Sequence, residues 1–182
     1  MPPHRAPVGP FPEGADPESY DRLRRRVLWS MPAGIYLLGS VAGERRNLMT
    51  CNWVTQVATA PKLVAAAVES GAYTAGLVRD GGVFCVSLLA REDRALARRF
   101  AKPAADDRPA RTLNGVAYLD APVTGAPLAA AALAWLDCRV VAEHDLGSHC
   151  LFLGEVVDAG APEGEGPLAV LRMEDTRMSY GG

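Results

Sequence analysis

Short apolar stretches separated by turn-forming residues recur along this chain, and they constrain its fold more than any other feature. The candidate strands are residues 35–41, 47–58, 63–68, 84–89, 136–142, 149–157 and 168–171. Their spacing predicts about six or seven antiparallel strands that close into a barrel, so we expect a mainly β protein. The chain has no βαβ rhythm and no G-x-G-x-x-G motif, which argues against a dinucleotide-binding α/β fold.

The clearest strand pair lies in the C-terminal half of the chain. Apolar and charged side chains alternate through residues 136–143, as they do in a half-buried strand. Asp145–Ser148 supplies turn residues, and residues 149–157 form the returning strand of a hairpin. Three segments have helical spacing instead, and there we expect short helices: residues 16–29, 73–79 and 91–100.

Two regions make up the predicted domain organisation. Residues 1–17 are rich in proline and are expected to form a flexible N-terminal arm. Residues 18–182 are long enough to bury the core of one barrel domain with a few short helices.

Charge and cysteine usage exclude several classes of function. Asp and Glu outnumber Lys and Arg by 21 to 19, so nothing favours nucleic-acid binding. The four cysteines stand singly in apolar stretches and the three histidines are far apart, which argues against a disulfide framework or a metal site. The N-terminus lacks a signal-peptide pattern, and the longest apolar run, residues 128–136, is too short to cross a membrane. We therefore expect a cytoplasmic protein.

Residues 47–61 combine the pattern of a strand with an unusual number of small polar side chains. These side chains are Thr50, Asn52, Thr55, Gln56 and Thr59. Short hydroxyls and amides, together with free backbone N–H groups, can meet the polar edge of a flat ligand. The same pattern is also typical of an edge strand with a threonine-rich solvent face.

Three motifs in a fixed order carry a family resemblance. The first is Met49-Thr50 with Trp53, continued by Gln56–Leu63, and the second is Phe84–Leu89 followed by Leu96–Ala101. The third runs from Leu133 to Val140 and on to Gly147-Ser148-His149 and Leu151–Val156. In these motifs the chain, from about residue 31 to 180, resembles the flavin reductase family, whose domain is the FMN-binding split β-barrel.

Two positions depart from the family pattern. Ser148 stands where the family commonly has an acidic residue between the glycine and the histidine of the hairpin. Ala58–Lys62 replaces a loop that often carries a serine and two consecutive prolines. These departures leave the fold assignment intact and concern which flavin and which electron donor are used.

The resemblance implies roles for eleven residues. Thr50, Cys51, Asn52 and Trp53 would meet the isoalloxazine ring and ribityl chain, and Gln56, Val57, Ala58 and Thr59 would cradle the pyrimidine edge or the phosphate. Ser70 and Thr74, beside a helix start, would contact the phosphate, and His149 would lie near the nicotinamide as the catalytic-site histidine.

Plain structural alternatives stand beside these roles. Trp53 fits a packing aromatic at the barrel mouth, and Ser70 fits a helix N-cap. His149 fits an exposed hairpin residue. Cys51 and Cys150 fit inert buried thiols better than redox centres.

The function implied by the resemblance is an NAD(P)H-dependent flavin reductase. The flavin would be FMN, with FAD as the alternative, and NADH or NADPH would donate the hydride. The family also implies a homodimer and a partner monooxygenase that receives diffusible reduced flavin. Two alternatives stay open: an electron-transfer protein that holds FMN tightly, like flavoredoxin, and a flavin-free accessory binding protein on the same barrel.

Overall fold

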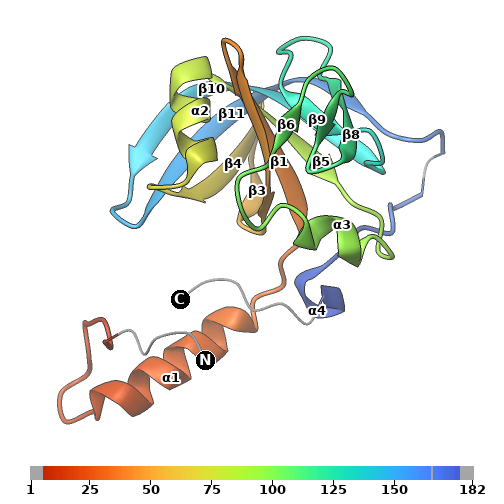
Figure 1. Ribbon diagram of the computed structural model, residues 1–182. Coiled ribbons are helices and arrows are strands. Elements are labelled where there is room, and N and C mark those ends of the chain that lie inside the picture. Colours follow the sequence, from red (N-terminus) through yellow and green to blue (C-terminus); the bar gives the residue numbers. More distant parts are fainter. Residues whose placement is uncertain (1–5, 165, 177–182) are drawn as a thin grey trace. The chain divides into compact units, whose positions relative to one another are not determined.

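The computed structural model describes residues 6–164 and 166–176. The described chain divides between Pro32 and Ala33 into two compact units, each considered separately below. The first contains helix α1, and the second contains all the strands (Figure 1). No helix among the described residues is both long enough and apolar enough to cross a bilayer.

Helix α1 (Pro17–Trp29) is the only regular element described before residue 33. Asp16 caps it by accepting a hydrogen bond of 2.9 Å from the Ser19 amide, and this bond lowers the pKa of the Asp16 carboxyl. The guanidinium of Arg24 donates to the carbonyls of Val8 and Pro10. The preceding segment therefore contacts the helix around Arg24.

Seven antiparallel strands form the main sheet of the second unit, in the order β2-β1-β5-β10-β11-β4-β3. Their bounds are β1 Tyr36–Ala42, β2 Arg45–Cys51, β3 Val54–Thr59, β4 Lys62–Glu69, β5 Val83–Leu88, β10 Ala134–Asp145 and β11 His149–Gly160. The predicted mainly β class is confirmed, because antiparallel strands form both sheets of the described residues and the helices are few and short.

The barrel core is packed from strands that are far apart in sequence. Phe84 on β5 and Phe152 on β11 are fully buried together with Leu38 on β1. Gly154 on β11 lies flat against the ring of Phe84, because a Cβ there would come within 2.5 Å of the ring. A larger residue at position 154 would displace Phe84.

The predicted β10–β11 hairpin is confirmed. Asp145 pairs with Cys150 in the register, and the turn between them contains Gly147 with φ of 83°. Such a positive φ favours glycine. The Gly147 amide also donates to the Asp145 carboxylate at 2.8 Å, so the turn residues stabilise the turn themselves.

Three predicted elements differ from the structure. Residues 47–58 are two strands, because the chain turns at Asn52 and Trp53 and the Trp53 carbonyl accepts from the Ala67 amide at 2.9 Å. Residues 168–171 make one isolated bridge, Val170 to Ala90, in place of a strand. The helix predicted over residues 91–100 is only α3 (Arg94–Arg98), and α4 (Met173–Thr176) follows near the end of the described chain.

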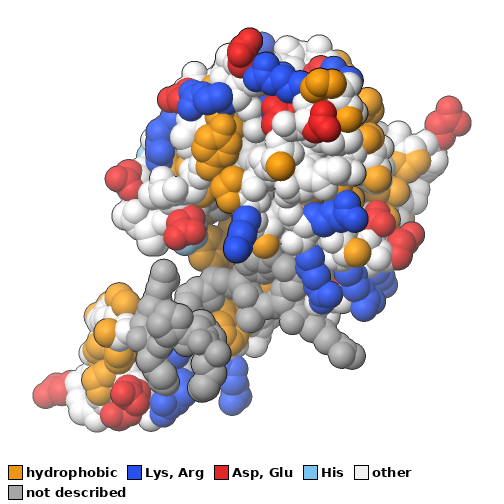
Figure 2. Space-filling view, in the orientation of Figure 1, with side chains coloured by type: hydrophobic (Ala, Val, Ile, Leu, Met, Phe, Trp, Pro, Cys, Tyr) orange, Lys and Arg blue, Asp and Glu red, His pale blue; other side chains and the backbone are white. Residues whose placement is uncertain are grey.

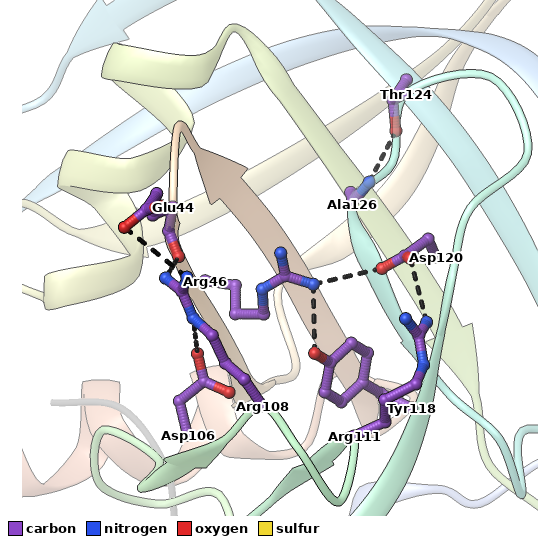
Figure 3. Close-up of polar contacts among 9 residues, drawn as sticks. All are labelled: Glu44, Arg46, Asp106, Arg108, Arg111, Tyr118, Asp120, Thr124 and Ala126. Atoms are coloured by element: carbon purple, nitrogen blue, oxygen red, sulfur yellow. Dashed lines mark hydrogen bonds and ion pairs between the residues drawn. The ribbon is translucent and has the colours of Figure 1, made fainter.

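A small second sheet was not predicted. Its strands are β6 Asp106–Asp107, β7 Thr112–Leu113, β8 Val116–Asp120 and β9 Pro127–Ala129. Figure 3 shows how polar contacts join β8 to β2: Arg46 donates to the Tyr118 hydroxyl at 3.1 Å and to the Asp120 carboxylate at 3.2 Å. Arg111 binds the same carboxylate at 2.9 Å, so Asp120 links two arginines.

Helix α2 (Tyr73–Gly81) packs against β1 and β2, and its Ala75 and Val78 are buried in the same core cluster as Phe84 and Phe152. A Cβ at Gly81 would come within 1.9 Å of the Val41 carbonyl, so the helix end approaches β1 directly. The helix predicted at residues 73–79 is confirmed, and Gly82 ends it with φ of 66°.

Candidate active site

The two edge strands of the main sheet, β2 and β3, hold most of the predicted site residues. Thr50 and Cys51 lie at the end of β2, and Gln56, Val57, Ala58 and Thr59 lie on β3. Asn52 and Trp53 form the connection between the two strands. The two edges have very different surroundings.

The β2 edge is covered by the segment that contains α3. The Thr50 amide donates to the Phe100 carbonyl at 3.0 Å, and the Thr50 hydroxyl donates to the Ala97 carbonyl. Thr50 is only 7% exposed. Its side chain is therefore engaged in an internal contact, and Cys51 at the end of the strand is buried as well.

Asn47 extends this covered edge toward α2. Its amide group donates to the Thr74 hydroxyl at 2.8 Å, and its carbonyl accepts from the Ala104 amide at 2.8 Å. Asn47 and Thr74 are each 1% exposed. This arrangement supports an internal role for Thr74, away from the surface on which a phosphate could bind.

Cys51 and Asn52 form the corner where β2 ends. The Cys51 thiol is 3.7 Å from the Ala67 carbonyl, and burial raises its pKa from 9.0 to about 11. A protonated, buried thiol fits the inert packing interpretation. Asn52 is half-buried, and within the described residues its side-chain amide has no hydrogen-bond partner. That amide is free to bind a ligand.

Trp53 and His149 meet at the rim of the barrel. Their ring centroids are 4.6 Å apart, and the ring planes are inclined by 49°. Trp53 is 43% exposed, so one part of its indole remains open to a ligand. Packing alone therefore does not account for Trp53, because its ring contacts His149 at the surface and is not enclosed in the core.

Ser70 and Ser148 support His149 from the neighbouring turns. The Ser148 hydroxyl lies 3.0 Å from His149 Nδ1, and the Ser70 hydroxyl donates to the Gly147 carbonyl at 2.9 Å. The Ser70 amide also donates to the Ser148 carbonyl at 3.0 Å. Ser70 does not cap α2, whose N-cap is Ala72 without a side-chain bond. It holds the hairpin turn that carries His149.

The β3 edge is open. Thr55, Gln56, Val57 and Thr59 are exposed, and a bulge separates Gln56 from Ala58 in the pairing with β4. An edge strand presents unpaired N–H and C=O groups in alternation. Together with the Asn52 amide and the Trp53 ring, this edge provides polar and aromatic contacts for a flat ligand.

Cys150 lies close to His149 in sequence but faces the interior. Its thiol is 3.0 Å from a Glu143 carboxylate oxygen, and Arg79 binds the same oxygen at 2.5 Å. Burial raises the pKa of the Cys150 thiol, while the bonds from Cys150 and Arg79 lower the pKa of the Glu143 carboxyl. This supports a packing role for Cys150.

Sequence reasoning did not assign a role to Ser148, although it directly precedes His149. One feature of the sequence could have pointed to it: Ser148 stands where the family commonly has an acidic residue. Within the described residues, no group of three or more His, Cys, Asp or Glu side chains is placed to hold a metal ion.

Comparisons with known proteins identify the family of this chain. The family model for the flavin reductase-like domain matches residues 28–178. An NADH-dependent FAD reductase from Streptomyces globisporus is 33% identical over 155 residues, which are 84% of this chain and 82% of that protein. The NADH-dependent flavin reductase StyB from Pseudomonas fluorescens is 32% identical, over 81% of this chain and 82% of that protein.

Solved structures show the same similarity. The NADH:FAD oxidoreductase SgcE6 from Streptomyces globisporus C-1027 aligns with a TM-score of 0.73 and 29% identity, over 96% of this chain and 95% of that one. BorF, the flavin reductase component of a bacterial two-component tryptophan halogenase, aligns with a TM-score of 0.67 and 31% identity, over 79% of this chain and 88% of that one. The chain belongs to the flavin reductase-like domain family.

Proposed function

We propose that this protein is an NAD(P)H-dependent flavin reductase that releases reduced flavin to a partner monooxygenase. The observation that carries the proposal is the Trp53–His149 pair beside the open β3 edge. It combines an aromatic surface with an unpaired polar strand, which are the contacts that a flat heteroaromatic ring requires.

The residues at the open edge fit a flavin. The backbone of residues 56–59 and the side-chain amide of Asn52 would hold its polar edge, with Trp53 against the ring system. A bound flavin would supply the acceptor for the hydride of NAD(P)H, chemistry that belongs to the cofactors. His149 would position the nicotinamide, because hydride transfer between aligned rings needs no protein base.

Relatives support a two-component system. One is named the reductase component of a 4-nitrophenol monooxygenase from Rhodococcus opacus, 32% identical over 81% of this chain. The reductase of styrene monooxygenase from Pseudomonas putida S12 has a similar structure, with a TM-score of 0.64 and 29% identity over 76% of this chain. We extend this to a diffusible flavin, a homodimer and a cytoplasmic location for this protein.

The choice of flavin and donor is part of the proposal. The motifs suggested FMN, whereas the Streptomyces globisporus relative is named as an FAD reductase. We keep FMN as the proposed flavin and FAD as the competitor, with NADH or NADPH as donor.

Anaerobic stopped-flow spectroscopy tests the proposal. Each flavin is mixed with each nicotinamide and the purified protein, and bleaching of the flavin is followed. Turnover of added flavin supports the reductase, tightly bound yellow colour without turnover favours an electron-transfer flavoprotein, and absence of flavin affinity contradicts both.

Substitution of His149 tests its role within this reaction. His149→Ala should raise KM for NAD(P)H and lower kcat, with flavin affinity nearly unchanged. His144→Ala is the matched control, because His144 is an exposed histidine on the same hairpin. Loss of flavin binding, or constants equal to those of the control, would remove His149 from the proposed site.

A further inference from the structure

We propose that Ser148 is a positioning residue: its hydroxyl donates to Nδ1 of His149 and holds that ring in the form that carries its proton on Nε2. The Nε2–H group is then available to donate to the carbonyl oxygen of the nicotinamide carboxamide. This role rests on the proposed function, because it assigns the hydrogen bond through which His149 would position NAD(P)H.

The backbone on both sides of Ser148 is held by hydrogen bonds. The Ser70 amide donates to the Ser148 carbonyl at 3.0 Å, and the Ser70 hydroxyl donates to the Gly147 carbonyl at 2.9 Å. The Leu146 amide donates to the His149 carbonyl at 2.8 Å and closes the turn. The 3.0 Å contact between Ser148 Oγ and His149 Nδ1 is therefore made from a backbone that is fixed at both residues.

Two different contacts hold the imidazole of His149. Trp53 lies against it with the ring centroids 4.6 Å apart, and the Ser148 hydroxyl bonds to its Nδ1. A half-turn of the imidazole about its Cβ–Cγ bond would keep the contact with Trp53, but it would put a carbon atom where Nδ1 lies. The ring contact therefore fixes where the imidazole lies, and the Ser148 hydroxyl decides which edge carries each nitrogen.

The proton between the two side chains can lie on either of them. A neutral imidazole has one N–H donor and one acceptor nitrogen, and the bond made by one nitrogen sets the state of the other. If Ser148 donates to Nδ1, its hydroxyl proton is paired and Nε2 keeps its own proton. If Nδ1 donates instead, the hydroxyl proton has no acceptor among the described residues. The Nε2–H form is also the one that a free histidine side chain favours, so we assign the donor role to Ser148.

Nε2 of His149 is open to a ligand. Within residues 6–164 and 166–176 it has no hydrogen-bond partner, and Glu69, which lies opposite His149 in the pairing of β4 with β11, forms no ion pair with it. Histidine is visible at the surface on the side of the barrel that carries the β10–β11 hairpin (Figure 2). A carboxamide carbonyl accepts from an N–H group, whereas an unprotonated Nε2 would meet it with a lone pair. The proton that Ser148 keeps on Nε2 is therefore the one that this ligand requires.

NMR spectroscopy of the imidazole nitrogens tests the position of the proton. In mildly alkaline buffer, in which histidine side chains are ordinarily neutral, long-range ¹H–¹⁵N spectra distinguish a protonated ring nitrogen from an unprotonated one. The signals of His149 are those that disappear in His149→Ala. We expect the proton on Nε2 in the parent protein and in Ser148→Thr, which keeps the hydroxyl, and a mixture of both forms in Ser148→Ala. A proton on Nδ1 in the parent, or identical spectra for Ser148→Ala and the parent, overturns this role.

Steady-state kinetics test the consequence for NAD(P)H. Ser148→Ala should raise KM for NAD(P)H about three- to tenfold, as expected for the loss of one hydrogen bond, with the flavin Kd unchanged. Ser148→Thr should retain the parent KM. In a His149→Ala background, Ser148→Ala should have no further effect, because Ser148 acts only through that ring.

Leu146→Ala is the matched control, because Leu146 is an exposed residue of the same turn. Equal KM values for Ser148→Ala and this control, or a further rise in KM in the double variant, would also overturn the role of Ser148. The spectra require no turnover, so they decide the position of the proton even if the parent protein fails to reduce flavin. That failure would contradict the reductase itself, whereas normal turnover by the parent with the proton on Nδ1 would contradict only the role of Ser148.

Discussion

The β2 and β3 strands are the two edges of one sheet, and they differ in what covers them. On β2, Asn47 and Thr50 are buried and bonded to α3 and the segment that follows it. On β3, Thr55, Gln56 and Val57 are exposed. Similar small polar residues thus stabilise the fold on one edge and face solvent on the other. Polar composition alone does not locate a ligand site; the site is expected where the edge is left uncovered.

The largest effect should come from removing Asn47 on the covered edge. Asn47→Leu leaves the Thr74 hydroxyl and the Ala104 amide without their partner, at a cost of about 3 kcal/mol. Urea unfolding measures this loss. The matched change on the open edge, Gln56→Leu, should alter stability by no more than about 0.5 kcal/mol. Similar losses at the two positions would break the comparison.

The next largest difference should be in the reactivity of thiols on the two edges. The pKa of Cys51 is raised to about 11, so its thiolate near neutral pH is about a hundredfold scarcer than that of an ordinary thiol. A Gln56→Cys thiol on the open edge should react with iodoacetamide much faster than Cys51. Mass spectrometry of the alkylated peptides gives both rates, and fast labelling of Cys51 in the folded protein would contradict the burial.

The same thiol has a consequence for stability. Its folded pKa lies above its ordinary value of 9.0, so the neutral form is favoured by folding. The stability that the buried, neutral Cys51 thiol contributes is fully present below pH 9.0 and declines as the pH rises toward 11. Cys51→Ala should therefore lose less stability than the parent protein between pH 9 and 11, as measured by denaturant midpoints.

Trp53 tests the ligand side of the comparison. Trp53→Ala should weaken flavin binding by about 1.4 kcal/mol, or tenfold in Kd, because it removes an aromatic contact at the rim. Folding stability should change little, since the ring is 43% exposed. Fluorescence titration with FMN and FAD measures the affinity. A large stability loss with unchanged affinity would return Trp53 to a packing role.

Substitution of Thr74 should change stability less than substitution of Asn47. It tests whether Thr74 belongs to the covered edge or to the flavin site. Thr74→Val removes the acceptor for Asn47 and should cost about 1 kcal/mol of stability, with flavin affinity nearly unchanged. The family resemblance implied a phosphate contact instead. A rise of about tenfold or more in the flavin Kd, with stability retained, would favour that contact.

Much of the strand framework could be predicted from local patterns. The β10–β11 hairpin combines period-two alternation with its own turn residues, so its position follows from residues 136–157 alone. The start of α1 could also be predicted from neighbouring residues, because Pro17 suits the first position of a helix. In the structure Asp16 is the N-cap. The order of three motifs was sufficient to predict the family, which the comparisons confirm.

The break between β2 and β3 could not be predicted in this way. Residues 47–58 read as one strand in the sequence, but the chain turns at Asn52 and Trp53. From Trp53 onward it pairs with β4, where the Trp53 carbonyl accepts from the Ala67 amide, and a strand that comes later in the chain cannot be seen in the local pattern. The short strands of the second sheet were missed for a different reason: β6 and β7 have two residues each and β9 has three, too few for any periodicity.

The sequence by itself determined where most strands of the main sheet and helices α1 and α2 lie, and which residues carry the family motifs, because these depend on neighbouring residues. Only the tertiary structure decided which polar residues are covered. Asn47 reaches Thr74 and Ala104, and Trp53 reaches His149, through contacts between segments far apart in the chain. Burial and pairing are properties of such distant contacts, and a local pattern carries no information about them.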